Sequence, residues 1–182
     1  MESPEFQVKV IEQAWLDGCS SEEDLCSHGK IELAIGGEPV TSGDEDYGVS
    51  ESALALLRTL NSNHSSDKTV AEHLIVHGCG TMLMFGCPIG VGWEVAHSNG
   101  RVRISKVVRH DEYGEADVVE FPNLDVEMTE EEYRREIVAF AKEAKLLFTG
   151  VTKVFTDEYG QKEYEDFWEE YDRLLNRYED AV

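Results

Sequence analysis

Basic residues are scarce in this chain of 182 residues. Sixteen lysines and arginines stand against 38 aspartates and glutamates, which gives a net charge of -22. A surface this negative repels phosphate backbones and anionic membranes. The sequence therefore predicts no nucleic-acid partner and no membrane partner, and it favours a basic protein as the molecule that this chain binds.

Long apolar runs are also missing. No run approaches the length that a membrane-spanning helix needs, and the first residues, MESPE, lack a basic segment followed by an apolar one. The four cysteines, at positions 19, 26, 79 and 87, are too few for a disulfide framework. We expect a cytoplasmic protein with free thiols that folds as a single domain over residues 1–182, because 41% hydrophobic residues suffice to form a core.

The familiar catalytic motifs are absent from the sequence: it contains no Walker loop, no GxGxxG, no HExxH and no GxSxG. The glycine-rich run at 78–92 contains no lysine, so we interpret its glycines as turns and close packing. Arg101, Arg103, Lys106 and Arg109 share one predicted strand, and we expect them to pair with nearby acids instead of binding a nucleic acid.

Alternating apolar residues predict the strands. Within residues 6–16, Phe6, Val8 and Val10 alternate as in a strand, although Ile11, Ala14 and Trp15 also fit helical spacing. A clearer strand is indicated at 30–35, followed by a turn at Gly36-Gly37. An antiparallel meander is expected over 71–110. Within it, Asn99-Gly100 predicts a type I′ hairpin, after which Val102, Ile104 and Val108 should face inward.

Helical periodicity predicts three helices. A short helix is expected after Ser50 as its N-cap, and a long helix after a capping box formed by Thr129 and Glu132. The last helix carries an apolar stripe: Tyr164, Phe167, Trp168, Tyr171, Leu174, Leu175 and Tyr178. Together these patterns predict an α+β fold, a mainly antiparallel sheet with helices packed on one face and two long helices at the C-terminal end.

The acidic residues concentrate toward the C-terminal end, where residues 111–182 hold 22 acids and 8 bases. Two interpretations remain open: an ordinary solvated helix surface, or a docking surface for a basic partner. The predicted partner-binding residues are Asp44, Asp46, Tyr47 as an aromatic anchor, Asp157, Glu158, Glu165, Asp166 and Glu169. In size and charge, though in no motif, the chain resembles the immunity proteins that neutralise bacterial toxins. That resemblance implies an inhibitor of a basic toxin or of a nucleic-acid-binding enzyme.

Cysteine and histidine recur at a spacing of two residues. Cys26 and His28, and again His77 and Cys79, would each share one face of a strand, so together they predict a zinc site. A thiol nucleophile at Cys79, with His77 or His73 as its base, is an alternative that would make the chain a metal- or thiol-dependent enzyme. In a further interpretation the cysteines are only small buried residues. A homodimer formed through the stripe of the last helix is also open.

Overall fold

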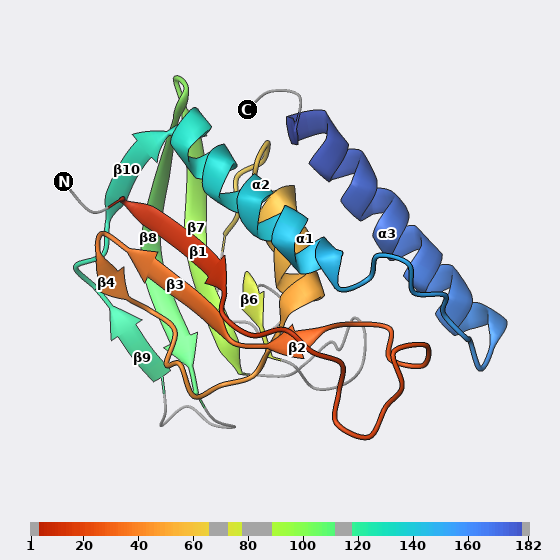
Figure 1. Cartoon of the computed structure of the whole chain (residues 1–182). Coiled ribbons are helices and arrows are strands. Elements are labelled where there is room, and N and C mark those ends of the chain that lie inside the picture. Colours follow the sequence, from red (N-terminus) through yellow and green to blue (C-terminus); the bar gives the residue numbers. More distant parts are fainter. Residues whose placement is uncertain (1–3, 66–72, 78–88, 112–117, 180–182) are drawn as a thin grey trace.

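The computed structural model describes residues 4–65, 73–77, 89–111 and 118–179 (Figure 1). Three helices and ten strands lie within this part of the chain, and the two longest helices come last, so the predicted α+β class is confirmed. In chain order the elements are β1 (Phe6–Val10), β2 (His28–Gly29), β3 (Ile31–Ile35), β4 (Glu38–Pro39), β5 (Tyr47–Gly48), α1 (Val49–Arg58), β6 (Ile75–Val76), β7 (Gly90–Ser98), β8 (Arg101–His110), β9 (Val118–Phe121), β10 (Val126–Thr129), α2 (Glu130–Leu146) and α3 (Glu158–Glu179).

Two antiparallel sheets enclose much of the core. The smaller has the strand order β1-β3-β4, and the larger has the order β10-β8-β7-β6 with β9 added beside β8. Phe6 of β1 lies against Trp93 of β7, with ring centroids 6.1 Å apart, and both side chains are buried. β2 and β5 form a separate two-stranded pair. The described strands of the predicted meander, β6, β7 and β8, pair in chain order within the larger sheet, while β1, β3 and β4 form a sheet of their own.

Both predicted turns are confirmed. Gly36 and Gly37 adopt φ values of 59° and 78°, and Asn99 and Gly100 adopt 52° and 75° at the tip of the β7–β8 hairpin. A positive φ at both central positions is what a type I′ turn requires.

A β-bulge interrupts the alternation in β8. Gly92 pairs with Val108 whereas Glu94 pairs with Ser105, so β8 holds one extra residue there, and Lys106 has a φ of 53°. The extra residue shifts every later side chain to the opposite face. Val107 is therefore buried in the core, and the prediction that Val108 would occupy that place was wrong.

α1 starts without a side-chain cap of its own. Its N-cap is Gly48, and Ser50, predicted as the cap, lies inside the first turn. The backbone N–H groups of Val49 and Ser50 donate to the carbonyl oxygen (2.8 Å) and the side-chain oxygen (3.1 Å) of Ser27. A distant segment thus satisfies the free donors of the first turn.

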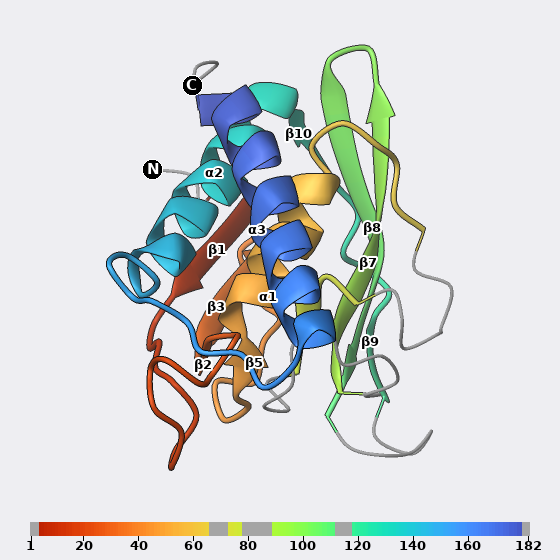
Figure 2. The same cartoon turned by 90° about the vertical axis from the view of Figure 1, so that its right-hand side faces the viewer.

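α3 lies across the outer side of α1 and α2 (Figure 2). The Tyr171 hydroxyl donates to the backbone oxygen of Ala141 in α2 at 2.7 Å. Five members of the apolar stripe of α3 are buried: Phe167, Tyr171, Leu174, Leu175 and Tyr178. The stripe is consequently covered within the chain itself and does not offer the homodimer interface that was considered for it. None of the helices in the described ranges combines the length and apolar character needed to cross a bilayer.

The capping box of α2 provides a test of the fold. The Thr129 hydroxyl accepts from the N–H of Glu132 at 3.1 Å, and the Glu132 carboxylate accepts from the N–H of Thr129 at 2.9 Å. We expect Thr129→Ala to lower the free energy of unfolding by about 1 kcal/mol, because the N–H of Glu132 loses its acceptor and the Glu132 carboxylate loses the hydroxyl that donates to it. Urea denaturation measures the change. Thr152→Ala, in an exposed connection, is the control and should stay within about 0.5 kcal/mol of the parent protein.

Candidate functional site

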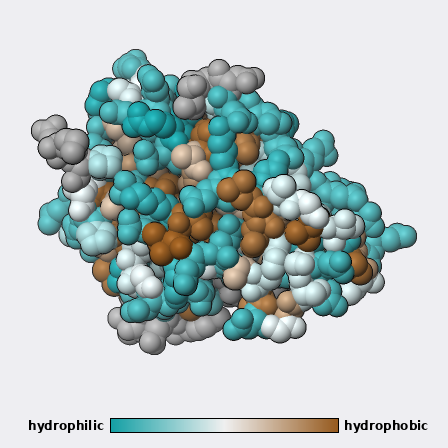
Figure 3. All heavy atoms as spheres, in the orientation of Figure 1, coloured by the Kyte–Doolittle hydropathy of each residue, from teal (hydrophilic) through white to brown (hydrophobic). Residues whose placement is uncertain are grey.

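The predicted acidic residues of the last helix are at the surface. Asp157, Glu158, Glu165, Asp166 and Glu169 are all exposed. In the space-filling view, hydrophilic residues predominate on the right, where α3 runs (Figure 3). Asp157 also has a structural role, since its carboxylate accepts from the N–H of Gly160 at 2.7 Å beside the start of α3.

The basic residues of β8 are paired with acids. Arg101 binds Glu127, Arg103 binds Asp125, and Lys106 binds Glu94 at 2.7 Å. Arg109 forms a two-bond contact with Asp111. The expectation that these bases pair with local acids is confirmed, and much of the negative charge of the large sheet is neutralised in this way.

In the first half of α3 and at the residue before it, fewer of the acids have a basic partner. Residues 157–170 hold seven acids and one base, Lys162, which binds Asp166. Glu170 is held by Arg58 of α1 at 2.5 Å. Within the described part of the chain, Glu158, Glu165 and Glu169 take part in no ion pair. The excess of acids over bases is therefore large on this stretch, although exposed carboxylates without an ion pair also occur elsewhere among the described residues, as at Glu38 and Glu131. We name Glu158, Tyr159, Glu163, Glu165 and Glu169 the α3 acidic surface.

The aromatic residue of this surface is Tyr159, which the sequence analysis missed. Its side chain is 72% exposed, and its hydroxyl donates to the Glu163 carboxylate, which raises the pKa of Tyr159. Tyr159 lies outside the apolar stripe, and that position could have indicated its exposure. Val154, in the connection before α3, is a second exposed apolar residue.

The predicted patch around Tyr47 needs correction. Asp44 and Asp46 are accessible, but Tyr47 is only 1% exposed and cannot serve as a surface anchor. The backbone pairing of β5 with β2 places the ring in the core. Lys30 lies 3.2 Å from the carboxylate of Asp46 and donates to the backbone oxygen of Asp44, so the acids of this loop are partly engaged.

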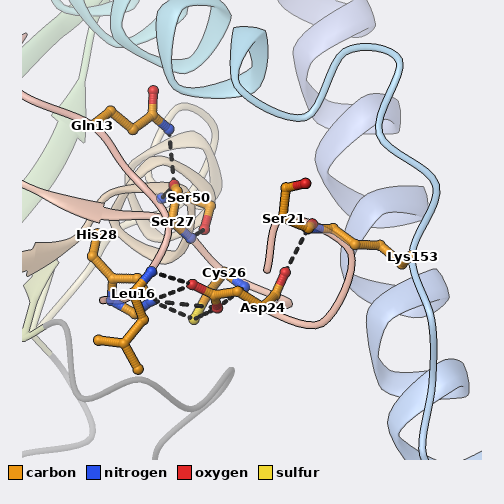
Figure 4. A network of polar contacts seen from close by, with 9 residues as sticks. All are labelled: Gln13, Leu16, Ser21, Asp24, Cys26, Ser27, His28, Ser50 and Lys153. Carbon is orange, nitrogen blue, oxygen red and sulfur yellow. Dashed lines mark hydrogen bonds and ion pairs between the residues drawn. The ribbon is translucent and has the colours of Figure 1, made fainter. Parts of the chain in front are cut away.

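Two of the predicted metal ligands converge with a third residue that was not predicted. Asp24, Cys26 and His28 follow one another at intervals of two residues before and at the start of β2, and their side chains point toward one another (Figure 4). The Cys26 Sγ lies 3.5 Å from the His28 Nε2, which lies 3.2 Å from one carboxylate oxygen of Asp24 and 3.4 Å from the other. All three residues are buried. We name them the 24–28 cluster.

The carboxylate of Asp24 is held in place by its surroundings. It accepts from the backbone N–H groups of Leu16 at 2.7 Å and Cys26 at 3.2 Å. Burial alone would raise the pKa of Asp24, but the hydrogen bonds with His28, Leu16 and Cys26 outweigh it, so the pKa lies below its usual value. The group therefore stays ionised near neutral pH.

The thiol of Cys26 is not arranged as a nucleophile. Burial, and then the negative charges of Glu51 and Asp24, raise its pKa far above the ordinary value. In a thiol–imidazole–carboxylate triad, the imidazole uses one nitrogen for the thiol and the other for the carboxylate. Here the Nε2 of His28 faces both groups, and this geometry does not position a base for proton transfer.

His77, which belongs to the other half of the predicted zinc site, does not join this cluster. His77 forms a bridge with Tyr47, and its Nε2 lies 3.9 Å from a carboxylate oxygen of Glu45. It is not part of the ligand group that the described residues form. Cys79 and Cys87 lie outside the described residues, so the roles suggested for them stay predictions.

A pocket of about 470 Å³ opens beside the cluster, and His28 forms part of its wall. Its other lining residues come mainly from the segment 12–17, whose Ala14 exchanges backbone hydrogen bonds of 2.8 and 2.9 Å with His28. A Cβ added at Gly29 would overlap the carbonyl oxygen of Glu12. Only glycine permits this close approach of the two segments.

Comparisons with known proteins give no relative: no family model matches the chain, and neither a curated protein nor a solved structure is significantly similar to it. The site therefore has to be interpreted from its own geometry.

The burial of Cys26 makes a prediction about thiol reactivity. With EDTA present, we expect iodoacetamide to modify the exposed Cys19 of the native protein and to leave Cys26, 1% exposed, unmodified until the chain is unfolded. Mass spectrometry of the two peptides measures both rates. Equal rates for Cys19 and Cys26 in the native state would contradict the burial of this thiol.

His73 makes a prediction about pH. Burial, followed by the nearby His110, lowers the pKa of His73 to about 4, and the two rings lie 5.1 Å apart. The unfolded chain binds this proton near pH 6.5 and the folded chain only near pH 4, so stability should fall as the pH falls through that window.

Urea midpoints between pH 7 and pH 4 measure the effect. His73→Asn should reduce the slope of the unfolding free energy by up to about 1.4 kcal/mol per pH unit. The slope that remains in His73→Asn would include the titration of His110, whose pKa is also lowered by burial. An unchanged slope would show that His73 titrates normally in the folded protein.

Proposed function

We propose that this protein binds a basic protein partner through the α3 acidic surface and acts as an inhibitor or mask of that partner's cationic site. The observation that carries the proposal is the unequal compensation of charge. The acids that flank the basic residues of β8 are paired with them, whereas Glu158, Glu165 and Glu169 are exposed and take part in no ion pair among the described residues.

The chemistry of the surface suits a cationic partner in two ways. Uncompensated carboxylates on one helix attract a basic surface from a distance and increase the association rate. Tyr159, exposed among these carboxylates, supplies an aromatic group that can be buried in the complex. Aromatic residues of this kind often contribute a large part of the binding free energy. A partner with a nucleic-acid-binding site has the complementary charge.

α3 is a rigid support for this surface. Arg58 of α1 holds Glu170, and Lys145 of α2 holds Asp172 at 2.5 Å. The buried stripe fixes the other side of the helix to the core. The acidic side chains are thus presented on a preformed helix, and binding requires little ordering of the backbone.

Two charge variants of equal net charge test the proposal. The test variant combines Glu158→Gln, Glu165→Gln and Glu169→Gln. The control variant combines Glu38→Gln, Glu131→Gln and Glu143→Gln, three exposed acids outside α3 that also form no ion pair within the described ranges. Each variant removes three negative charges, so non-specific attraction falls equally in both.

Each protein is immobilised and used to capture basic proteins from a cell extract, and each captured protein is then purified and titrated. We expect the parent and the control variant to retain the same basic partner and the test variant to associate about tenfold more slowly at low salt. Tyr159→Ala should weaken the affinity at least about tenfold, mainly through faster dissociation. Capture that is equal for both charge variants, or that does not change with ionic strength, would refute the proposal.

A further inference from the structure

We propose that Asp24, Cys26 and His28 bind a divalent cation of the zinc type. The site is separate from the α3 acidic surface and does not depend on the function proposed for that surface. Its three ligand atoms are a thiolate sulfur, an imidazole nitrogen and a carboxylate oxygen, and they lie within 4.8 Å of one another.

The separations between the ligand atoms match a tetrahedral ion. Zinc binds sulfur at about 2.3 Å, nitrogen at about 2.0–2.1 Å and oxygen at about 2.0–2.2 Å, so neighbouring ligands in a tetrahedron lie about 3.4–3.6 Å apart. The observed distances are 3.5 Å from sulfur to nitrogen, 3.4 Å from nitrogen to the Oδ1 of Asp24 and 3.8 Å from sulfur to that oxygen. An ion fits at the centre after shifts of a few tenths of an ångström.

A direct ion pair explains these distances less well. A charged hydrogen bond between imidazolium and carboxylate contracts to about 2.7–2.9 Å. Arg109 and Asp111 reach 2.7 Å in this structure, whereas the His28 Nε2 stays at 3.2 and 3.4 Å from the two oxygens of Asp24. The three side chains surround a common point instead of closing on one another.

The second nitrogen of His28 is not used by the cluster. The residue is 7% exposed, and its Nδ1 is buried without a hydrogen-bond partner among the described residues. Both neighbouring groups of the cluster lie on the Nε2 side, so Nε2 is the nitrogen that would bind the ion. A histidine that binds a metal through one nitrogen usually donates the N–H of the other to an acceptor, and no described residue supplies that acceptor here. His28 also lines the pocket, which provides a route from solvent to that side of the cluster.

The surroundings hold the ligands in position before an ion binds. The backbone N–H groups of Leu16 and Cys26 orient the carboxylate of Asp24. Lys153 donates to the backbone oxygens of Ser21 at 2.7 Å and Asp24 at 2.5 Å, which fixes the loop that carries the carboxylate. Partners of this kind raise metal affinity because the ligands need less reorganisation.

The ligand set selects the class of ion. Magnesium and calcium prefer oxygen atoms only, whereas a thiolate together with an imidazole suits zinc and its neighbours in the transition series. One thiolate and one carboxylate also balance the charge of a divalent cation. The occupied cluster is therefore neutral, which lowers the cost of burying it.

Cobalt(II), with zinc as competitor, tests the site. The full chain is freed of metal with EDTA, kept reduced with a phosphine, and titrated with cobalt(II). We expect one equivalent to give a thiolate-to-cobalt charge-transfer band in the near ultraviolet together with the visible bands of a tetrahedral complex. One equivalent of zinc should remove these bands and raise the midpoint of thermal unfolding.

Four variants decide which residues bind. Cys26→Ser should abolish the charge-transfer band, and Asp24→Asn and His28→Gln should each weaken binding at least about tenfold. Cys19→Ser, at the exposed cysteine, is the control and should bind as the parent does. Circular dichroism of the metal-free proteins shows whether each variant folds. If Cys26→Ser does not fold, the metal affinity of Asp24→Asn tests the site.

Two results would overturn the proposal. One is a wild-type protein that binds no stoichiometric cobalt or zinc. The other is a charge-transfer band that persists in Cys26→Ser, or an affinity that is unchanged in Asp24→Asn. Neither result bears on the α3 acidic surface, because the charge variants are assayed for partner capture in metal-free buffer.

Discussion

The 24–28 cluster depends on the hydrogen bonds that tie Ser27, the residue between Cys26 and His28, to α1. Ser27 is tied to α1, because its N–H donates to the Ser50 hydroxyl at 3.0 Å while its carbonyl and hydroxyl oxygens accept from the first turn of that helix. The side-chain amide of Gln13 also donates to the Ser27 hydroxyl, at 2.8 Å. Ser27 thus faces α1, while Asp24, Cys26 and His28 on either side of it in the chain converge on one another.

Aromatic packing connects this segment to the acidic helix. Trp168 of α3 packs on Phe148 at 4.6 Å between ring centroids, and Phe148 packs on Trp15 at 4.8 Å. The ammonium of Lys153 lies 3.7 Å from the centroid of Trp15 while it holds the loop of Asp24. The same cluster of rings thus supports both the loop that carries Asp24 and the helix that presents the acidic surface.

Local patterns predicted what local interactions determine. The capping box at Thr129, the Asn99-Gly100 hairpin and the buried stripe of α3 follow from residues close in sequence. The bulge at Lys106, the cap that Ser27 provides and the burial of Tyr47 depend on distant segments, so no local pattern of residues indicates them. Asp24 was missed among 38 acids, although Asp24, Cys26 and His28 visibly follow one another at intervals of two residues.

The close approach at Gly29 has a consequence for how the neighbouring pocket can change. Backbone atoms, and not side chains, set the separation of the two segments that meet at this glycine. Glu12, Asp17 and Asp46 contribute exposed carboxylates to the lining of the pocket, and exchanging their side chains leaves that backbone contact in place. Selectivity for what enters the pocket would therefore evolve by exchange of these charges without separation of the two segments.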